Sequence, residues 1–158
     1  MIRIRNATQD DIEPFKEVIK SSILVLCKDF YTPDQIKALL GQFPDFDLYA
    51  KWIDERVLIV AENNGVVIGF AQYTPELALI EAVHVEPSMA RSGIGKMLVN
   101  AIEKVAMSQG ASKISLESSL NAVEFYKKCG YQRKQSSSYL CKGGVTLETV
   151  SFEKVLNS

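Results

Sequence analysis

The segment Val83-His-Val-Glu-Pro87 … Arg91-Ser-Gly-Ile-Gly-Lys-Met-Leu98 carries the most informative pattern in the chain. An apolar strand leads through a short loop into Gly93-x-Gly95, where a helix is expected to begin. Glycines let a backbone approach a ligand closely, and the free N–H groups and dipole of a helix N-terminus favour an anion. Side chains around the same turn add charge and donors: Arg91, Ser92 and Lys96. The turn therefore predicts a pyrophosphate site, unless its N–H groups are met by water alone.

Two common nucleotide-binding loops do not fit this segment. No Gly-x-x-x-x-Gly-Lys-Ser/Thr run exists in the chain, which excludes a Walker-type loop. A dinucleotide fingerprint would need a third glycine where Leu98 stands, and a preceding βαβ unit. The sequence instead predicts an antiparallel hairpin before the turn, so a nicotinamide enzyme is disfavoured.

The chain before the turn predicts a hairpin preceded by helices. Asn64-Gly65 lies between two apolar runs, and this dipeptide favours a tight hairpin turn. Thr32-Pro33-Asp34-Gln35 has the residues of a capping box with proline at the first helical position. The buried face of that helix is expected to comprise Ile36, Leu39, Leu40 and Phe43. The expected elements are a strand at 2–5, helices from 10–11 and from 33, a helical turn at 46–52, and strands at 57–62, 66–73 and 77–85.

The chain after the turn continues the alternation of helices and strands. The expected elements are a helix at 91–109, a strand at 113–117, a helix at 121–128, a strand from Tyr131 and a strand at 145–155. The whole order, βααβββαβαββ, predicts an α/β fold with a mixed, mostly antiparallel central sheet and helices on both faces. A length of 158 residues predicts one domain spanning residues 1–158.

Composition narrows the class of protein. The 18 Lys and Arg residues nearly balance 19 Asp and Glu residues, which gives no support for nucleic-acid binding. No apolar run is long enough to span a membrane, and the N-terminus lacks the pattern of a signal peptide. Cys27, Cys129 and Cys141 are widely spaced and odd in number, which predicts neither a disulfide framework nor a metal site. A cytoplasmic protein is expected.

A second motif, Leu120-Asn-Ala-Val-Glu-Phe-Tyr-Lys-Lys-Cys-Gly-Tyr131, follows the first. Together the two segments resemble the GNAT superfamily of acetyl-CoA-dependent N-acetyltransferases. The first is similar to its (Gln/Arg)-x-x-Gly-x-(Gly/Ala) turn, and the second to its Asn-x-x-x-Phe-Tyr-x-x-x-Gly-(Phe/Tyr) helix. The element order matches that fold over essentially the whole chain. One departure is Ala90 at the Gln/Arg position, with Arg91 one place later, which leaves open the side chain that meets the pyrophosphate.

The resemblance implies a transferase that uses acetyl-CoA as co-substrate and needs no metal. It implies that the fourth and fifth strands, at 77–85 and 113–117, splay apart to admit the pantetheine arm. Asn121 would contact that arm, although a helix N-cap is an alternative role. The other residues implied in coenzyme binding are Val83, His84 and Val85 at the arm, Arg91, Ser92, Gly93, Ile94, Gly95 and Lys96 at the pyrophosphate, and Phe125 and Tyr126 on the following helix.

Acetyl transfer to an amine needs a base for the ammonium and benefits from an acid for the thiolate. Tyr126 matches the position of the family's frequent general acid; packing of its helix is the alternative. Glu81 is the first candidate base, acting through water, and Glu117 is the second. The alternative for Glu81 is a solvated or ion-paired strand residue. Strand alternation would place Glu81 on the face of Val83 and Val85, unless a bulge breaks it. The ring of the lone histidine, His84, is expected to be structural.

The acceptor pocket is expected to come from the first two helices and their loop. Aromatic residues concentrate there, mostly as core, with one or two able to meet a cationic amine: Phe30, Tyr31, Phe43, Phe46, Tyr49 and Trp52. An acidic excess in residues 1–62 also suits a cationic acceptor, and surface solvation explains it equally well. A small-molecule amine is the favoured acceptor. The alternatives are a protein or peptide amine and a non-catalytic acyl-CoA sensor, and exposed late strands suggest a homodimer.

Overall fold

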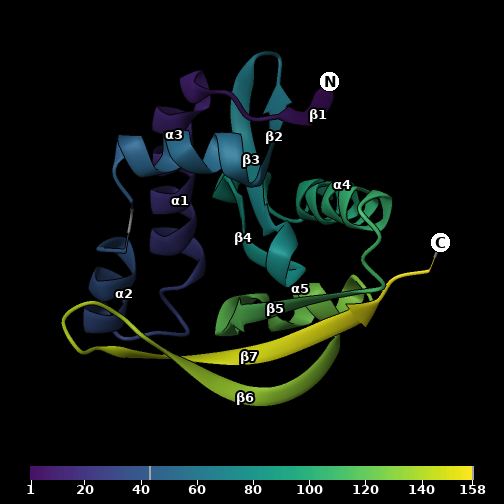
Figure 1. Ribbon diagram of the computed structural model, residues 1–158. Helices are drawn as coiled ribbons and strands as arrows, with labels where there is room; N and C mark the ends of the chain where they lie inside the picture. The colour runs from purple at the N-terminus through teal and green to yellow at the C-terminus, as the bar shows by residue number, and fades with distance from the viewer. Residues whose placement is uncertain (43, 158) are drawn as a thin grey trace.

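A computed structural model describes residues 1–42 and 44–157 (Figure 1). Seven strands form one sheet in the order β1-β2-β3-β4-β5-β7-β6. All neighbouring pairs are antiparallel except β4 with β5. This is the mixed, mostly antiparallel sheet that the sequence predicts. The strands are β1 (Ile2–Asn6), β2 (Val57–Asn63), β3 (Val66–Thr74), β4 (Leu79–Val85), β5 (Lys113–Ser119), β6 (Gln132–Leu140) and β7 (Thr146–Val155).

Two of the described helices begin at a residue whose side chain caps the first turn. The Thr32 hydroxyl oxygen accepts a hydrogen bond from the Gln35 N–H, and Gln35 Oε1 accepts one from the Thr32 N–H, so the predicted capping box is present. Asp45 caps the next helix by accepting from the Leu48 N–H. The helices are α1 (Ile12–Leu26), α2 (Pro33–Leu40), α3 (Phe46–Glu55), α4 (Ile94–Ser108) and α5 (Val123–Lys128).

Three helix expectations need adjustment. The helix expected at 91–109 begins only at Ile94 and ends at Ser108. The extra turn expected at 46–52 is the ten-residue helix α3, so the described residues between β1 and β2 form three α-helices rather than two. The helix expected from Asn121 begins at Val123, after a 3-10 turn at Leu120–Ala122. Phe43, expected in the buried face of α2, lies outside the described residues.

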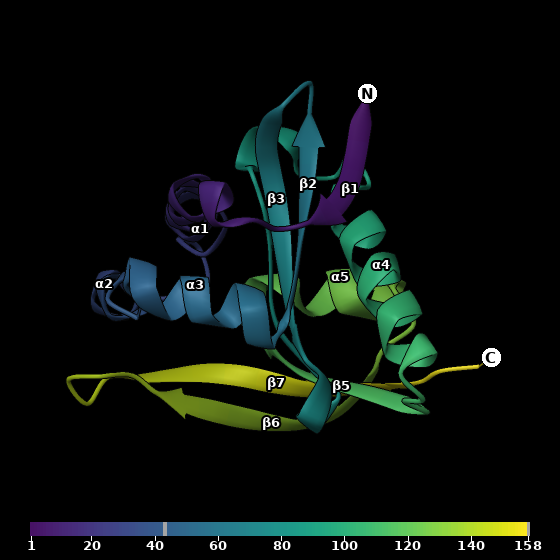
Figure 2. The same ribbon diagram turned by 45° about the horizontal axis from the view of Figure 1, so that its top comes forward.

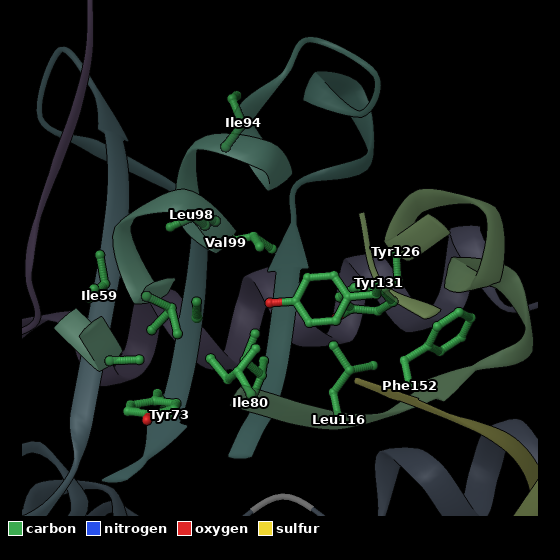
Figure 3. Packing of buried hydrophobic residues seen from close by; sticks show 14 of the residues in the cluster. Ile59, Tyr73, Ile80, Ile94, Leu98, Val99, Leu116, Tyr126, Tyr131 and Phe152 are labelled. Atoms are coloured by element: carbon green, nitrogen blue, oxygen red, sulfur yellow. The ribbon is translucent and has the colours of Figure 1, made fainter. Parts of the chain in front are cut away.

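The helices cover the sheet from two sides, and each side has its own apolar core (Figure 2). On the side of α1 and α3, Phe15 and Tyr49 pack with Phe70 of β3. On the other side, Ile94, Leu98 and Val99 of α4 pack with Tyr126 of α5 and with inward residues of the strands (Figure 3). Burial of such large side chains, each worth about 1.5–3 kcal/mol, holds both layers to the sheet.

The sheet splits between β4 and β5. These two strands pair only at Leu79 with Ser115 and Ile80 with Leu116. Figure 2 shows β1–β3 standing apart from the layer formed by β5, β7 and β6. Within the described chain, the edge of β4 from Glu81 to Val85 therefore has no strand partner on the β5 side. The splay predicted between the fourth and fifth strands is confirmed.

A bulge in β4 lies at the mouth of this split. Gln72 of β3 is opposite Ala82, but the next residue, Tyr73, is opposite Ile80, so Glu81 is the extra residue. Val83 and Val85 pack into the core on the α4 side. Glu81 instead accepts a hydrogen bond from Thr74 (3.0 Å). The simple alternation that would place Glu81 with the two valines is therefore broken.

Candidate functional site

A cavity of about 620 Å³ opens at the split in the sheet. It is lined by the consecutive β4 residues 80–84, whereas a fully paired strand would present alternate residues to one side. Helices α1 and α3 supply Ile19, Ile23, Tyr49 and Trp52 to its wall, and Tyr126 of α5 reaches it from the other side. The cavity thus joins the free backbone edge of β4 to residues from both layers.

The turn before α4 presents a row of free N–H groups. Arg91 and Gly93 have φ angles of +65° and +88°, and the Met97 N–H is the first to donate into the helix, to Gly93 O. Among the described residues, the N–H groups of 91–96 donate to no protein acceptor. The turn and the helix N-terminus can therefore accommodate a phosphate group. This geometry fits the pyrophosphate of a coenzyme A molecule.

The side chains around this turn have different roles from one another. Arg91 and Lys96 are exposed and can pair with phosphate. The Ser92 hydroxyl donates to Met89 O, which leaves its lone pairs and its N–H available. Ile94 is 1% exposed and packs in the core, so only its backbone can meet a ligand.

Gly95 meets a packing requirement that its sequence motif did not reveal. A Cβ atom at this position would lie 2.9 Å and 3.0 Å from two ring atoms of Phe125. The helix α4 can therefore approach α5 closely only with glycine at this point. Phe125, expected among the coenzyme residues, packs α5 onto α4.

We expect Gly95→Ala to lower the free energy of unfolding by about 1–3 kcal/mol, because the Phe125 ring must move. Chemical denaturation measures this effect. The double variant with Phe125→Leu should recover part of the loss, since leucine leaves room for the new methyl group. Equal stability of Gly95→Ala and the original chain would contradict the close packing.

Tyr126 is 6% exposed and lines the cavity. Its ring contacts that of Phe125, with 5.0 Å between the centroids. It also contacts the rings of Tyr131 (5.9 Å) and Phe152 (6.2 Å) (Figure 3). Within the described residues its hydroxyl has no hydrogen-bond partner. Burial raises the pKa of Tyr126 above its ordinary value of 10, so the phenol is protonated at neutral pH. The cavity therefore contains a rigidly held proton donor.

Asn121 does not cap α5. The N-cap residue is Ala122, and the Asn121 Oδ1 accepts a hydrogen bond from Cys27 Sγ at 3.3 Å. The alternative role of Asn121 as an N-cap is therefore wrong, and its contact with a pantetheine arm stays a prediction. Burial raises the pKa of the Cys27 thiol to about 11, which keeps the thiol protonated as that donor.

The two candidate carboxylates come from the two strands that flank the split, and both line the cavity. Glu81, at the bulge of β4, accepts from Thr74 at one oxygen, and its other oxygen has no partner among the described residues. Glu117 of β5 has both oxygens occupied, by the hydroxyls of Thr149 (2.8 Å) and Ser151 (2.7 Å). Glu81 is therefore better placed than Glu117 to receive a proton through water.

The ring of His84 faces α1 rather than the split itself. It stacks on Phe70 with centroids 5.6 Å apart, and its Nδ1 lies 3.4 Å from Ser22 Oγ. Burial lowers the pKa of His84 to about 4, so the ring is neutral at physiological pH. These contacts agree with the structural role expected for the ring.

We expect stability to depend on pH through His84. Its pKa is about 4 in the folded chain, against an ordinary value of 6.5. Between these values the unfolded chain binds more protons, so unfolding becomes easier as pH falls from 6.5 to 4, by about 1–3 kcal/mol. Denaturation of His84→Gln should show a smaller loss over this window. An identical pH dependence in both proteins would contradict the depressed pKa.

Tyr31 joins two distant segments at the cavity, a role that the sequence did not indicate. Its hydroxyl accepts from the Leu120 N–H (3.0 Å) and donates to Glu148 O (2.7 Å), which ties the α1–α2 loop to β7. Of the aromatic residues expected near an acceptor, Tyr31, Tyr49 and Trp52 line the cavity, whereas Phe30 and Phe46 are exposed. Only the fold could show which of them lie together.

The splayed sheet, the anion-binding turn and the buried phenol define an enzyme that could hold a coenzyme A thioester in the split. Over residues 26–131 the chain matches the acetyltransferase (GNAT) family model. The chain therefore belongs to the GNAT family, and is an acetyl-CoA-dependent N-acetyltransferase as the sequence predicts. A GCN5-related N-acetyltransferase structure from Rhodopseudomonas palustris has 27% identity and a TM-score of 0.91, with 98% of this chain and 95% of that chain covered.

Two further relatives differ in how far they resemble this chain. The uncharacterized protein YyaT of Bacillus subtilis is 28% identical over 109 residues, which cover 69% of this chain and 73% of YyaT. A structure of yncA, a putative acetyltransferase from Salmonella typhimurium with its cofactor acetyl-CoA, is 19% identical with a TM-score of 0.74, and covers 99% of this chain and 95% of that chain. The latter likeness concerns the fold alone.

The described residues contain neither a membrane-spanning helix nor a cluster of metal-binding side chains. None of their helices has both the length and the apolar character that a membrane crossing requires. In the same residues, no group of three or more His, Cys, Asp and Glu side chains could hold a metal ion.

Proposed function

We propose that this N-acetyltransferase moves the acetyl group of acetyl-CoA directly to a primary amine of a small molecule while both substrates are bound. The observation that carries the proposal is the single cavity surface shared by the free edge of β4, Tyr126 and Glu81. Acetyl-CoA supplies an activated acyl group. The chain must supply orientation, a place for the amine proton and a donor near the coenzyme sulfur.

The roles of individual residues follow from their positions. The free N–H groups of 91–96 would bind the pyrophosphate, with Arg91 and Lys96 adding positive charge. Backbone groups of Val83, His84 and Val85 would bind the pantetheine arm and the thioester carbonyl along the unpaired edge of β4. Asn121 would contact the same arm from the start of the α5 region.

Proton transfer would use two residues on different walls of the cavity. Glu81 has an unoccupied carboxylate oxygen and would accept the amine proton through water. Tyr126 would donate its hydroxyl proton to the departing thiolate, because its high pKa keeps it protonated. Neither side chain needs a metal ion for this role.

The cysteines support direct transfer over an acetyl-cysteine relay. Burial raises the pKa of Cys27, Cys129 and Cys141, so each thiol is held in its less nucleophilic protonated form. A relay would need a thiolate in the cavity at neutral pH. A direct attack by the amine is therefore the simpler course.

The mouth of the cavity favours a small acceptor over a protein amine. The β6–β7 hairpin lines it with Ser137 and Tyr139, and the Tyr139 hydroxyl donates to Gln42 Oε1 at 3.2 Å. This contact links the hairpin to the residues that follow α2, and both of its partners line the cavity. A folded protein substrate would have to displace it. The expected homodimer remains a proposal, with the edge strand β6 as its surface.

A screen of amines with detection of released thiol tests the proposal, in parallel with calorimetry of coenzyme A. We expect saturable coenzyme binding and turnover with at least one small amine. Turnover confined to peptides would favour the protein-amine alternative. Coenzyme binding without turnover on any amine would favour a non-catalytic sensor.

A further inference from the structure

Arg56 places a positive charge in the wall of the cavity, and no described carboxylate pairs with it. It directly follows α3, and its guanidinium carbon lies 4.4 Å from the centre of the Trp52 ring. It is the only Lys or Arg among the described residues that line the cavity. The Arg56 guanidinium can therefore bind an anionic ligand, because no carboxylate of the described chain occupies it.

Trp52 holds the guanidinium at the end of a continuous series of aromatic contacts. Trp52 packs edge-on against Tyr49, Tyr49 packs against Phe15, and Phe15 stacks on Phe70. An arginine stacked on such a rigid surface loses little conformational freedom when it binds a ligand. The same stacking covers one face of Trp52, which makes this ring a poor site for a cationic amine.

Gln72 provides an independent sign of a ligand site in the same wall. It is only 5% exposed and lines the cavity, yet its amide makes no hydrogen bond within the described residues. Among the described residues, every side-chain nitrogen or oxygen that is fully buried has a hydrogen-bond partner. The unpartnered amide of Gln72 is therefore not fully buried, and it reaches the cavity surface. A buried amide normally has hydrogen-bond partners, and a bound ligand would provide them.

The sheet brings these groups into a row with Glu81. Val57, the residue after Arg56, ends the ladder opposite Tyr73, and the hydroxyl of the next β3 residue, Thr74, donates to Glu81. Gln72 lies two residues from Thr74 and therefore on the same face. Arg56 directly precedes β2 and Glu81 lies in β4, and β3 separates these two strands, so the backbones of the two residues are roughly 9–10 Å apart. An acceptor that spans this row would carry opposite charges at its two ends.

We propose that the acceptor is a small amine that also carries an anionic group, a carboxylate or a phosphate, which Arg56 and Gln72 bind while the amine points to the edge of β4. The inference rests on the proposed function for the reaction itself. The anion subsite, however, is a binding property that can be measured without turnover. The spacing favours several bonds between the amine and the anion.

The experiment compares straight-chain amino acids, from glycine to aminohexanoate, with alkylamines of the same length that lack the carboxylate. Aminoethyl phosphate tests a phosphate in place of the carboxylate. We expect kcat/KM to favour the anionic amine by at least about tenfold, mainly through KM. In Arg56→Gln this preference should disappear, and in Arg56→Lys part of it should remain. Gln72→Leu should reduce the preference, and Arg3→Gln, on the far edge strand β1, should not.

Binding provides the second readout, because Trp52 is the only tryptophan of the chain and touches Arg56. Aminohexanoate should change its fluorescence saturably in the original protein and in Arg56→Lys, but not in Arg56→Gln. Saturable binding without turnover would support the anion subsite and contradict the proposed reaction. Turnover with no preference for anionic amines, or binding unaffected by both Arg56 variants and Gln72→Leu, would overturn the inference.

Discussion

Gly93→Val is expected to weaken the binding of coenzyme A by at least about 100-fold, equivalent to the loss of one or two charged hydrogen bonds. Gly93 has a φ angle of +88° immediately before the first residue of α4. A β-branched residue is strained in this left-handed region by about 1–3 kcal/mol and would turn the backbone elsewhere. The N–H groups beside it would then no longer converge on one phosphate. Calorimetry with coenzyme A measures the change.

Gly110→Val is a matched control at the other end of the same helix. Gly110 has a φ angle of +86°, and a Cβ atom at either glycine would meet nothing within 4 Å. Both substitutions should therefore reduce stability to a similar extent through backbone strain, whereas only the change at Gly93 should reduce coenzyme binding. Equal affinities of the two variants for coenzyme A would show that the turn before α4 does not bind the coenzyme.

The local parts of the site were predictable from the sequence. The turn at Gly93 and the capping box at Thr32 depend on neighbouring residues, and both occur where the sequence places them. The splay between β4 and β5 was also expected, because two motifs in the right order imply the whole fold. Short-range backbone chemistry and a family pattern therefore account for the sheet, the cavity and the phosphate-binding turn.

The missing parts of the prediction depend on contacts between distant segments. The bulge at Glu81 appears only when β3 and β4 are aligned. The Tyr31 hydroxyl bonds to Leu120 and Glu148, which lie 89 and 117 positions further along the chain. The stacking of Arg56 on Trp52 is local, but its meaning depends on a cavity built from other strands. Residue types alone suggested a cationic acceptor. The wall of the cavity, however, contains the unpaired cation Arg56, which favours an acceptor with an anionic group.

Tyr126→Phe should lower kcat by more than about tenfold, because general acids commonly contribute 10²–10⁴-fold to a rate. The hydroxyl has no protein partner in the described chain, so its removal should leave both stability and the affinity for acetyl-CoA nearly unchanged. Single-turnover kinetics with excess enzyme would place the loss in the chemical step. Unaltered turnover would exclude Tyr126 as the acid.

Tyr131→Phe, a change in the neighbouring ring, should lower stability and leave turnover intact, the reverse of Tyr126→Phe. The Tyr131 hydroxyl donates to Glu103 Oε2 at 3.0 Å, and Lys154 bonds the other oxygen of Glu103 at 2.9 Å. Removing this buried, charged hydrogen bond should cost about 1–3 kcal/mol of stability. Turnover should persist, since Tyr131 is not among the residues that line the cavity. Both variants remove one hydroxyl from the same aromatic cluster. If only Tyr126→Phe loses turnover, the proton that the departing thiolate receives comes from Tyr126, the phenol that faces the cavity.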